Sequence, residues 1–202
     1  MPGNGKPISI IDLSSVPSDV VNVVVAILGR LIFDFAIWSR QDENRPILLV
    51  CEEAHRYVPN ERLDRFGLTR HVLERIAKEG RKYGVSLGLV TQRPSDLSES
   101  VLSQCGTIIS LRMNNDRDQA FVRNAMPEGS RGMLEAIPAL RNRECIVVGE
   151  GVAFPMRVRL SNLDEDLRPA SADPQFADQW SSDPAQSDLI ARVIRRWRVQ
   201  GQ

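Results

Sequence analysis

The sequence predicts an α/β fold with a mostly parallel sheet and flanking helices. Four short runs rich in apolar and β-branched residues alternate with stretches of helical pattern; the runs are residues 8–14, 46–51, 85–91 and 107–112. Such alternation is typical of parallel strands joined by crossover helices, because each connection must carry the chain back along the sheet before the next strand begins. After Pro138 the pattern changes, and there it predicts a β-hairpin followed by a helical tail.

The first predicted helix begins at Pro17 and Ser18 and runs to about Trp38. Proline is tolerated in the first turn because its missing N–H has no helical partner there. The segment is apolar on most faces, which predicts a helix packed inside a larger body. Its uncharged stretch ends at Arg30, and Asp34 follows, so it falls short of the roughly 20 apolar residues that span a bilayer. We therefore expect a buried helix and no membrane association.

The next elements continue the alternation. The polar segment 41–45 is expected to be a loop, and the continuous apolar run 46–51 a strand buried on both faces. A helix is expected from about Thr69, and Gly84 is placed to end it before the strand at 85–91. Shorter helices are expected at 95–104 and 116–125. The hairpin consists of residues 144–148 and 155–160, with the Gly-Glu-Gly turn at 149–151.

Composition excludes several classes of protein. Lys plus Arg number 26 and Asp plus Glu also number 26, so net charge gives no argument for binding nucleic acid, and any DNA contact must come from a local patch. The three cysteines, Cys51, Cys105 and Cys145, are widely spaced and odd in number, which fits neither a disulfide framework nor a metal site. A reducing, cytoplasmic setting is expected.

The strongest chemical signal is the pair Glu52 and Glu53 at the end of the predicted strand 46–51. An apolar strand that delivers two acids at its carboxyl end resembles a Walker B motif, and ligands of open α/β sheets bind at that edge. Glu52 would then help to hold Mg²⁺, usually through water. Glu53 would orient or deprotonate an attacking water. A strand that ends in a solvated acidic turn is the alternative.

Two further residues join this hypothesis. Gln92 follows the strand 85–91 and would face the two acids across the edge of the sheet, as a residue that senses the γ-phosphate or places the water. A simple turn before a helix is the alternative. Arg81, next to Gly80 at the end of a helix, is a candidate arginine finger for a neighbouring subunit. From the residues alone, a solvated charged face is the favoured interpretation of Arg81.

Several ordered motifs resemble the HerA family, hexameric bacterial and archaeal DNA translocases related to FtsK and to conjugative coupling ATPases. The matching runs are residues 52–59, 76–84, 89–94, 102–105 and 115–118, and residues 10–14 and 149–152 extend the match. The resemblance covers about residues 6–163 and implies a RecA-like P-loop NTPase core. We therefore expect two parts: the C-terminal portion of this core over 1–163, and a linker with a C-terminal helix over 164–202.

The resemblance implies an ATPase that uses ATP and Mg²⁺ to move along DNA as a homohexameric ring. Glu52 stands where an aspartate is common and would bind the metal; Glu53 matches the catalytic glutamate. Gln92 matches the sensor glutamine, and Arg81 matches the arginine that acts in trans. Members of the family pair with a NurA-like nuclease or with defence effector subunits, so such partners are expected too.

One motif of the family is missing. No G-x-x-x-x-G-K-S/T occurs in the sequence, and the run that ends at Lys6 is followed by Pro7 instead of Ser or Thr. We therefore expect the chain to be the C-terminal part of a longer translocase, inactive as an ATPase by itself. The alternative is a nucleotide-free RecA-like interaction module that serves assembly with partner subunits.

The tail has three interpretations. Residues 164–184 are rich in Asp, Pro, Ser and Ala, which predicts a linker or an extended arm, and a helix is expected from Ser187 to about Val199. One face of that helix is apolar and consists of Ile190, Val193, Ile194 and Trp197. The rest is basic and carries Arg192, Arg195, Arg196 and Arg198. It is either a surface helix docked on its own domain, a brace to the adjacent subunit as the resemblance implies, or a basic helix that contacts DNA.

Overall fold

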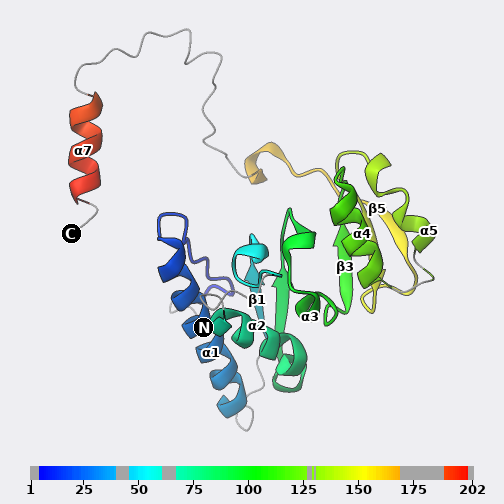
Figure 1. Cartoon of the computed structure of the whole chain (residues 1–202), viewed down its shortest axis with the longest axis horizontal. Helices are drawn as coiled ribbons and strands as arrows, with labels where there is room; N and C mark the ends of the chain where they lie inside the picture. The colour runs from blue at the N-terminus through cyan, green and yellow to red at the C-terminus, as the bar shows by residue number, and fades with distance from the viewer. Residues whose placement is uncertain are drawn as a thin grey trace. The chain divides into compact units, whose positions relative to one another are not determined.

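The computed structural model describes residues 5–39, 46–60, 67–126, 129, 131–168 and 189–199 (Figure 1). Contacts divide the chain into two compact units, Met1–Ser161 and Asn162–Gln202. The first unit contains two small sheets with helices packed against them. The second contains a short 3-10 helix, Glu165–Leu167, and the C-terminal helix α7, Leu189–Val199.

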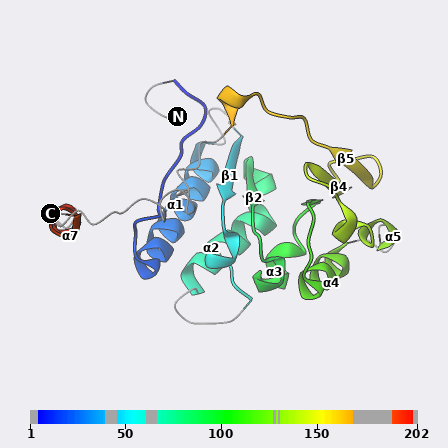
Figure 2. The same ribbon diagram turned by 90° about the horizontal axis from the view of Figure 1, so that it is seen from above.

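The first sheet is a parallel pair, β1 (Ile47–Cys51) and β2 (Val85–Leu89), in which Ile47 lies opposite Val85. Helices α1 (Ser18–Ser39) and α2 (Gly67–Glu79) pack on each other and against this pair (Figures 1 and 2). Their shared core is built from apolar side chains of all four elements, among them Val21, Phe33, Cys51, Leu73, Ile76 and Val85. The parallel α/β arrangement predicted from the sequence is confirmed here.

The expectation that β1 is buried on both faces is wrong. Leu48 and Val50 are 65% and 52% exposed, whereas Leu49 and Cys51 face the core. Burial alternates because the described helices cover one face of the pair only. The outward face of α1 is uncovered in the same way; its exposed apolar side chains are Val20, Val23, Ile27, Leu31, Phe35 and Trp38.

Helix α1 is therefore half-buried, not enclosed as the sequence predicted. Among the described residues it is the one helix long and apolar enough to cross a membrane, so the expectation that it is too short for this is also corrected. The core helix of a globular protein passes the same test of length and composition, and the face that carries Val21, Val25 and Phe33 packs in the core.

The second sheet is antiparallel and has the strand order β3-β4-β5. Its strands are β3 (Thr107–Ser110), β4 (Glu144–Gly149) and β5 (Met156–Arg159), and residues 150–155 join the last two where the sequence predicts a hairpin. Helices α4 (Asp116–Ala125) and α5 (Arg131–Leu134) lie beside it (Figure 1). The core of this sheet includes Val122, Leu134, Ile137, Ile146 and Val148.

Two predicted strands differ from the structure. The run 107–112 was expected to extend the parallel sheet, but β3 pairs antiparallel with β4 instead. Residues 8–13 form no strand, because no strand of the described chain lies along them to complete a ladder. Ile10 is 89% exposed, and the backbone N–H of Ser14 donates to Asp12 Oδ1 at 2.9 Å, which closes a turn.

Short 3-10 helices lie in the connections between β1, β2 and β3. A 3-10 helix, η1 (Ala54–Arg56), follows β1, and another, η3 (Gly80–Tyr83), extends α2 until Gly84 ends it with φ 75°, as the sequence predicts. A third, Pro94–Asp96, precedes the short helix α3 (Glu99–Leu102). Helix α4 begins where the side chain of Asn115 accepts the backbone N–H groups of Arg117 and Asp118, a regular N-cap.

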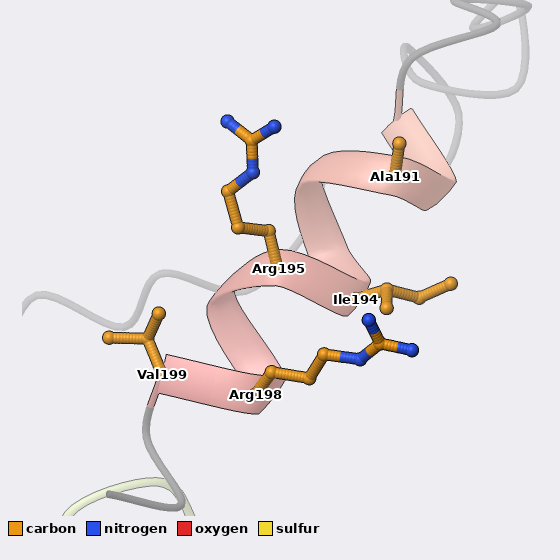
Figure 3. Close-up of a pocket in the computed structure, with 5 residues that line it drawn as sticks. All are labelled: Ala191, Ile194, Arg195, Arg198 and Val199. Atoms are coloured by element: carbon orange, nitrogen blue, oxygen red, sulfur yellow. The ribbon is translucent and has the colours of Figure 1, made fainter.

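In the second unit, α7 exposes both of its faces. Ile190 and Trp197 are 72% and 77% exposed, and the arginines between them are exposed too. The hollow drawn in Figure 3 lies along this one helix, lined by Ala191, Ile194, Arg195, Arg198 and Val199. Because a single helix cannot enclose a ligand, the hollow gives no binding site. Ser187 lies outside the described residues, and the three interpretations of this helix stay predictions.

A partly buried carboxylate, that of Glu74, links α2 to α3. Glu74 Oε1 accepts hydrogen bonds from Arg70 Nε at 2.8 Å, from Ser98 Oγ at 3.3 Å and from Ser100 Oγ. Burial would raise the pKa of this carboxyl, but the bonds from Ser100, Arg70 and Ser98 outweigh it and hold the pKa below its ordinary value of 4.5. The ionised form is therefore the one that the folded chain stabilises.

We expect Glu74→Gln to lower the free energy of unfolding by about 1 kcal/mol at neutral pH, because one charged acceptor serves three donors. A folded pKa below the unfolded one means that this stabilisation is fully present above about pH 4.5 and is lost as the pH falls through the folded value. Urea unfolding of both proteins at several pH values measures the difference. Glu79→Gln, which breaks only the exposed pair with Arg75, is the control and should cost less than about 0.5 kcal/mol.

Candidate active site

The carboxyl ends of β1 and β2 place the predicted acids beside the predicted glutamine. The last paired residues are Cys51 and Leu89, and two more backbone bonds continue the ladder beyond them. Val90 N–H donates to Cys51 O at 3.0 Å, and Ala54 N–H donates to Val90 O at 2.9 Å. The residues that follow each strand are therefore held at one edge of the sheet.

Glu53 adopts a left-handed backbone conformation, with φ 50° and ψ 47°. This reverses the chain directly after β1, so that the fully buried Ala54 opens the 3-10 helix η1 against the end of β2. For a residue other than glycine, this conformation costs about 1–2 kcal/mol of conformational free energy. Such strain is enriched at functional sites, which makes Glu53 a candidate for a functional residue.

Gln92 meets Glu53 as the sequence predicts. Gln92 Nε2 donates to Glu53 Oε1 at 3.0 Å, across 39 positions of sequence. Gln92 is exposed, and Glu53 is partly exposed, so the contact lies at the surface of the sheet edge where a ligand has access. Glu52, the other acid, is exposed at the same edge. The structure thus brings together three of the four predicted residues.

Two residues at this edge were not singled out from the sequence. His55 Nδ1 lies 3.1 Å from Thr91 Oγ1 and 3.4 Å from Glu53 Oε2. Thr91 Oγ1 also accepts the backbone N–H of Arg93 at 3.0 Å. Both could have been found by their proximity in sequence to predicted site residues. His55 follows the acid pair by two residues, and Thr91 immediately precedes Gln92.

Arg81 lies at the opposite end of β2. It belongs to η3, which precedes the strand, whereas Gln92 follows the strand. Five strand residues at about 3.3 Å each separate the two ends by roughly 16 Å. Its side chain is 94% exposed, and Nη1 lies 3.6 Å from Glu150 Oε2 of the β4–β5 connection. The structure therefore does not bring Arg81 to Glu53 within one subunit.

Gly80 explains how the arginine is presented. A Cβ at this position would collide with the carbonyl oxygen of Val85, so only glycine allows η3 to pack this closely on the first residue of β2. The tight packing directs the next residue, Arg81, out into solvent.

The acids at this edge suit a magnesium–nucleotide complex in part. Mg²⁺ prefers oxygen ligands, keeps several waters and is commonly held by one or two carboxylates together with substrate phosphates. Glu52 and Glu53 offer such oxygens. In the part of the chain that the structure describes, no three His, Cys, Asp or Glu side chains are grouped so as to hold a metal by themselves. The two glutamates therefore fit a metal that is held jointly by protein carboxylates and substrate phosphates. No phosphate-binding G-x-x-x-x-G-K-S/T is present in the sequence.

No family model matches the chain. It is 43% identical to the DNA double-strand break repair helicase HerA of Pyrococcus furiosus over 121 residues, which cover 59% of this chain and 21% of that protein. It is 33% identical to the helicase of the same name from Sulfurisphaera tokodaii over 195 residues, or 93% and 38% of the two chains. The relative from Sulfolobus acidocaldarius is 31% identical over 199 residues, or 94% and 38%. The chain thus spans about two fifths or less of the length of these relatives.

Two solved structures resemble this one. VirB4 of Thermoanaerobacter pseudethanolicus matches with a TM-score of 0.56 and 16% identity, over 78% of this chain and 41% of that one. The genome packaging NTPase B204 of Sulfolobus turreted icosahedral virus 2, in complex with sulfate, matches with a TM-score of 0.53 and 16% identity, over 69% and 63%. At this level of identity the likeness concerns the fold alone.

We expect Glu53→Gly to leave the free energy of unfolding unchanged or to raise it by up to about 1 kcal/mol. Glycine adopts the left-handed conformation without steric cost, and this gain offsets its larger entropy in the unfolded chain. Thermal or urea unfolding measures the change. Lys78→Gly, an exposed helical position in α2, is the matched control and should cost about 1 kcal/mol. A loss at Glu53 as large as that at Lys78 would show that the turn is not strained.

Proposed function

The chain is homologous to the HerA helicases along almost its whole length, and from this premise we propose that it supplies the hydrolytic residues of a DNA-translocating ATPase. The single observation that carries the proposal is the contact of Gln92 with Glu53 at the carboxyl ends of two parallel strands. We further propose that the ATPase is a longer protein that provides the P-loop, uses ATP and Mg²⁺, and works on DNA as a cytoplasmic homohexameric ring.

In this proposal each residue at the sheet edge has a separate task. Glu52 would help to hold Mg²⁺ through water, and the metal would supply charge neutralisation at the phosphates. Glu53 orients the attacking water and accepts its proton. Gln92 fixes one oxygen of that carboxylate and is placed to respond when a phosphate arrives. The strained turn at Glu53 supports this division, because it directs the carboxylate out of the sheet edge toward Gln92.

Arg81 would act on the site of a neighbouring subunit. Its own Glu53 lies beyond the far end of β2, out of reach of a single side chain, whereas its exposed guanidinium is free to approach another copy. The exposed pair with Glu150 contributes little to stability, so its loss costs little when a partner arrives. A NurA-like nuclease or a defence effector remains a proposed further partner.

One observation favours a different function. The 202 residues contain no phosphate-binding loop, so a nucleotide-free RecA-like module that mediates assembly is the second candidate. The two candidates differ in what Glu53 does. In an ATPase it is needed for turnover, whereas in an assembly module a change from carboxylate to amide has no chemical consequence.

In a P-loop-containing parent protein, we expect Glu53→Gln to abolish ATP hydrolysis and to leave ATP affinity nearly unchanged. The substitution preserves size and removes the base, so the loss falls on kcat. Steady-state hydrolysis and nucleotide-binding titrations measure the two quantities. Glu99→Gln, an exposed acid in α3, is the control and should retain full activity. Unchanged turnover in Glu53→Gln, or a collapse of ATP affinity with kcat retained, would contradict the role given to Glu53. Absence of hydrolysis in the unmodified parent would favour the assembly module.

We expect Arg81→Ala and Glu53→Gln to complement each other when both inactive variants of the parent are mixed in one ring. Some interfaces then combine an intact Glu53 with an intact Arg81, and part of the activity should return. An arginine finger is worth about 10³ or more in rate, whereas an exposed arginine that only pairs with Glu150 is worth less than about 1 kcal/mol. Lys82→Ala, the adjacent exposed cation, is the control. Full activity of Arg81→Ala by itself would end the proposal.

A further inference from the structure

The side chain of His55 lies between two groups of the candidate site. Its Nδ1 atom is 3.4 Å from Glu53 Oε2 on one side and 3.1 Å from Thr91 Oγ1 on the other. Gln92 holds the opposite oxygen, Oε1, of the same carboxylate. The two oxygens of Glu53 are thus contacted from different directions, one from the end of β2 and one from η1.

The fold of the turn does not need this side chain. Backbone bonds close the turn without it: Arg56 N–H donates to Glu53 O at 2.8 Å, and Tyr57 and Val58 N–H both donate to Ala54 O at 3.0 Å. Ala54 supplies the buried anchor, because it is fully enclosed and its backbone N–H donates to the carbonyl of Val90, the residue after β2. The imidazole is therefore free to serve the carboxylate.

The surrounding groups select one tautomer of His55. The ionised carboxylate of Glu53 can only accept a hydrogen bond. Thr91 Oγ1 already accepts from the N–H of Arg93 and has one remaining lone pair to offer. A proton on Nδ1 is donated to Thr91 Oγ1 and also attracts Glu53 Oε2 at 3.4 Å. A bare Nδ1 could accept from the Thr91 hydroxyl, but it would set its lone pair against the lone pairs of Glu53 Oε2. The chemistry thus places the N–H on Nδ1.

We propose that His55 is a positioning residue for Glu53: its Nδ1–H holds Oε2 and links the orientation of the carboxylate to Thr91 at the end of β2. This rests on the proposed function for the role of Glu53, but the contact itself does not. Glu53 is a side chain with three rotatable bonds, 41% exposed, and Gln92 alone would fix only one of its oxygens. Fixing the second oxygen confines the carboxylate to one orientation, which a base aligned on water requires.

Substitutions at His55 distinguish positioning from packing in the ATP-hydrolysing parent. The amide nitrogen of Asn lies as many bonds from the backbone as Nδ1, whereas that of Gln lies one bond further out, near the place of Nε2. We expect His55→Asn to keep most of kcat. His55→Gln and His55→Ala should each lose about tenfold or more in kcat, the scale on which outer hydrogen-bond partners act, with KM for ATP unchanged.

Two kinetic results would overturn the proposal. One is full activity of His55→Ala. The other is equal loss in the Asn, Gln and Ala variants, accompanied by a lower melting temperature, since this would indicate a packing role. Thr91→Val and Thr91→Ser give an independent check, because only the hydroxyl-bearing Thr91→Ser variant should match the wild type.

A second readout needs no ATPase activity and uses the 202-residue chain itself. Nitrogen-15 NMR of the imidazole separates the two neutral tautomers, and we expect the Nδ1–H form for His55, converted in part to the Nε2–H form in Glu53→Ala. His71, an exposed residue of α2, is the internal reference. An Nε2–H form in the wild type, or no response to Glu53→Ala, would overturn the proposal. If the parent hydrolyses no ATP and this readout holds, the proposed function fails while the His55 contact stands.

Discussion

The parallel pairing of β1 with β2 is the constraint on which the candidate site depends. Because parallel strands end at the same edge of a sheet, the register that sets Cys51 against Leu89 also sets Glu53 beside Gln92. The ladder continues for one more step through Ala54, so the turn after β1 is attached to its neighbour and does not float as a loop. Each side chain at the site takes its position from these backbone bonds, and a slip of one residue would separate Glu53 from Gln92 and His55 from Thr91.

Much of this edge could be predicted from the sequence, because it rests on local patterns and one general rule. Acids at the end of an apolar run and a glutamine at the end of the next run must meet if the two strands are parallel and adjacent, and Glu53 and Gln92 do so. Gly84 and Asn115 are equally local signals, since a left-handed glycine ends η3 and an asparagine side chain caps α4. Arg81 was found by its place beside Gly80, and because a strand separates it from Gln92 it lies at the other end of β2.

The rest depends on contacts that sequence pattern does not contain. An apolar run such as 46–51 has the same pattern whether helices cover one face of the strand or both. Leu48 is exposed because the described helices pack against only one face of the β1–β2 pair. The run 107–112 likewise carries no mark of which neighbour it pairs with, and β4 provides an antiparallel partner. His55 was missed for a different reason. Its approach to Thr91 requires the left-handed backbone conformation of Glu53. A glutamate gives no sequence signal for this conformation, whereas a glycine would.

The uncovered side chains of α1 and β1 have a consequence for how the chain behaves in solution. In the described chain β1 is paired on one edge only, and large apolar side chains of α1 and β1 are exposed. Surfaces of this kind promote non-specific association between molecules. Such association grows with concentration, whereas folding of the single chain does not. A partner that packs on this surface would therefore also keep the chain in solution. The solubility of the chain depends on that cover, whereas its fold does not.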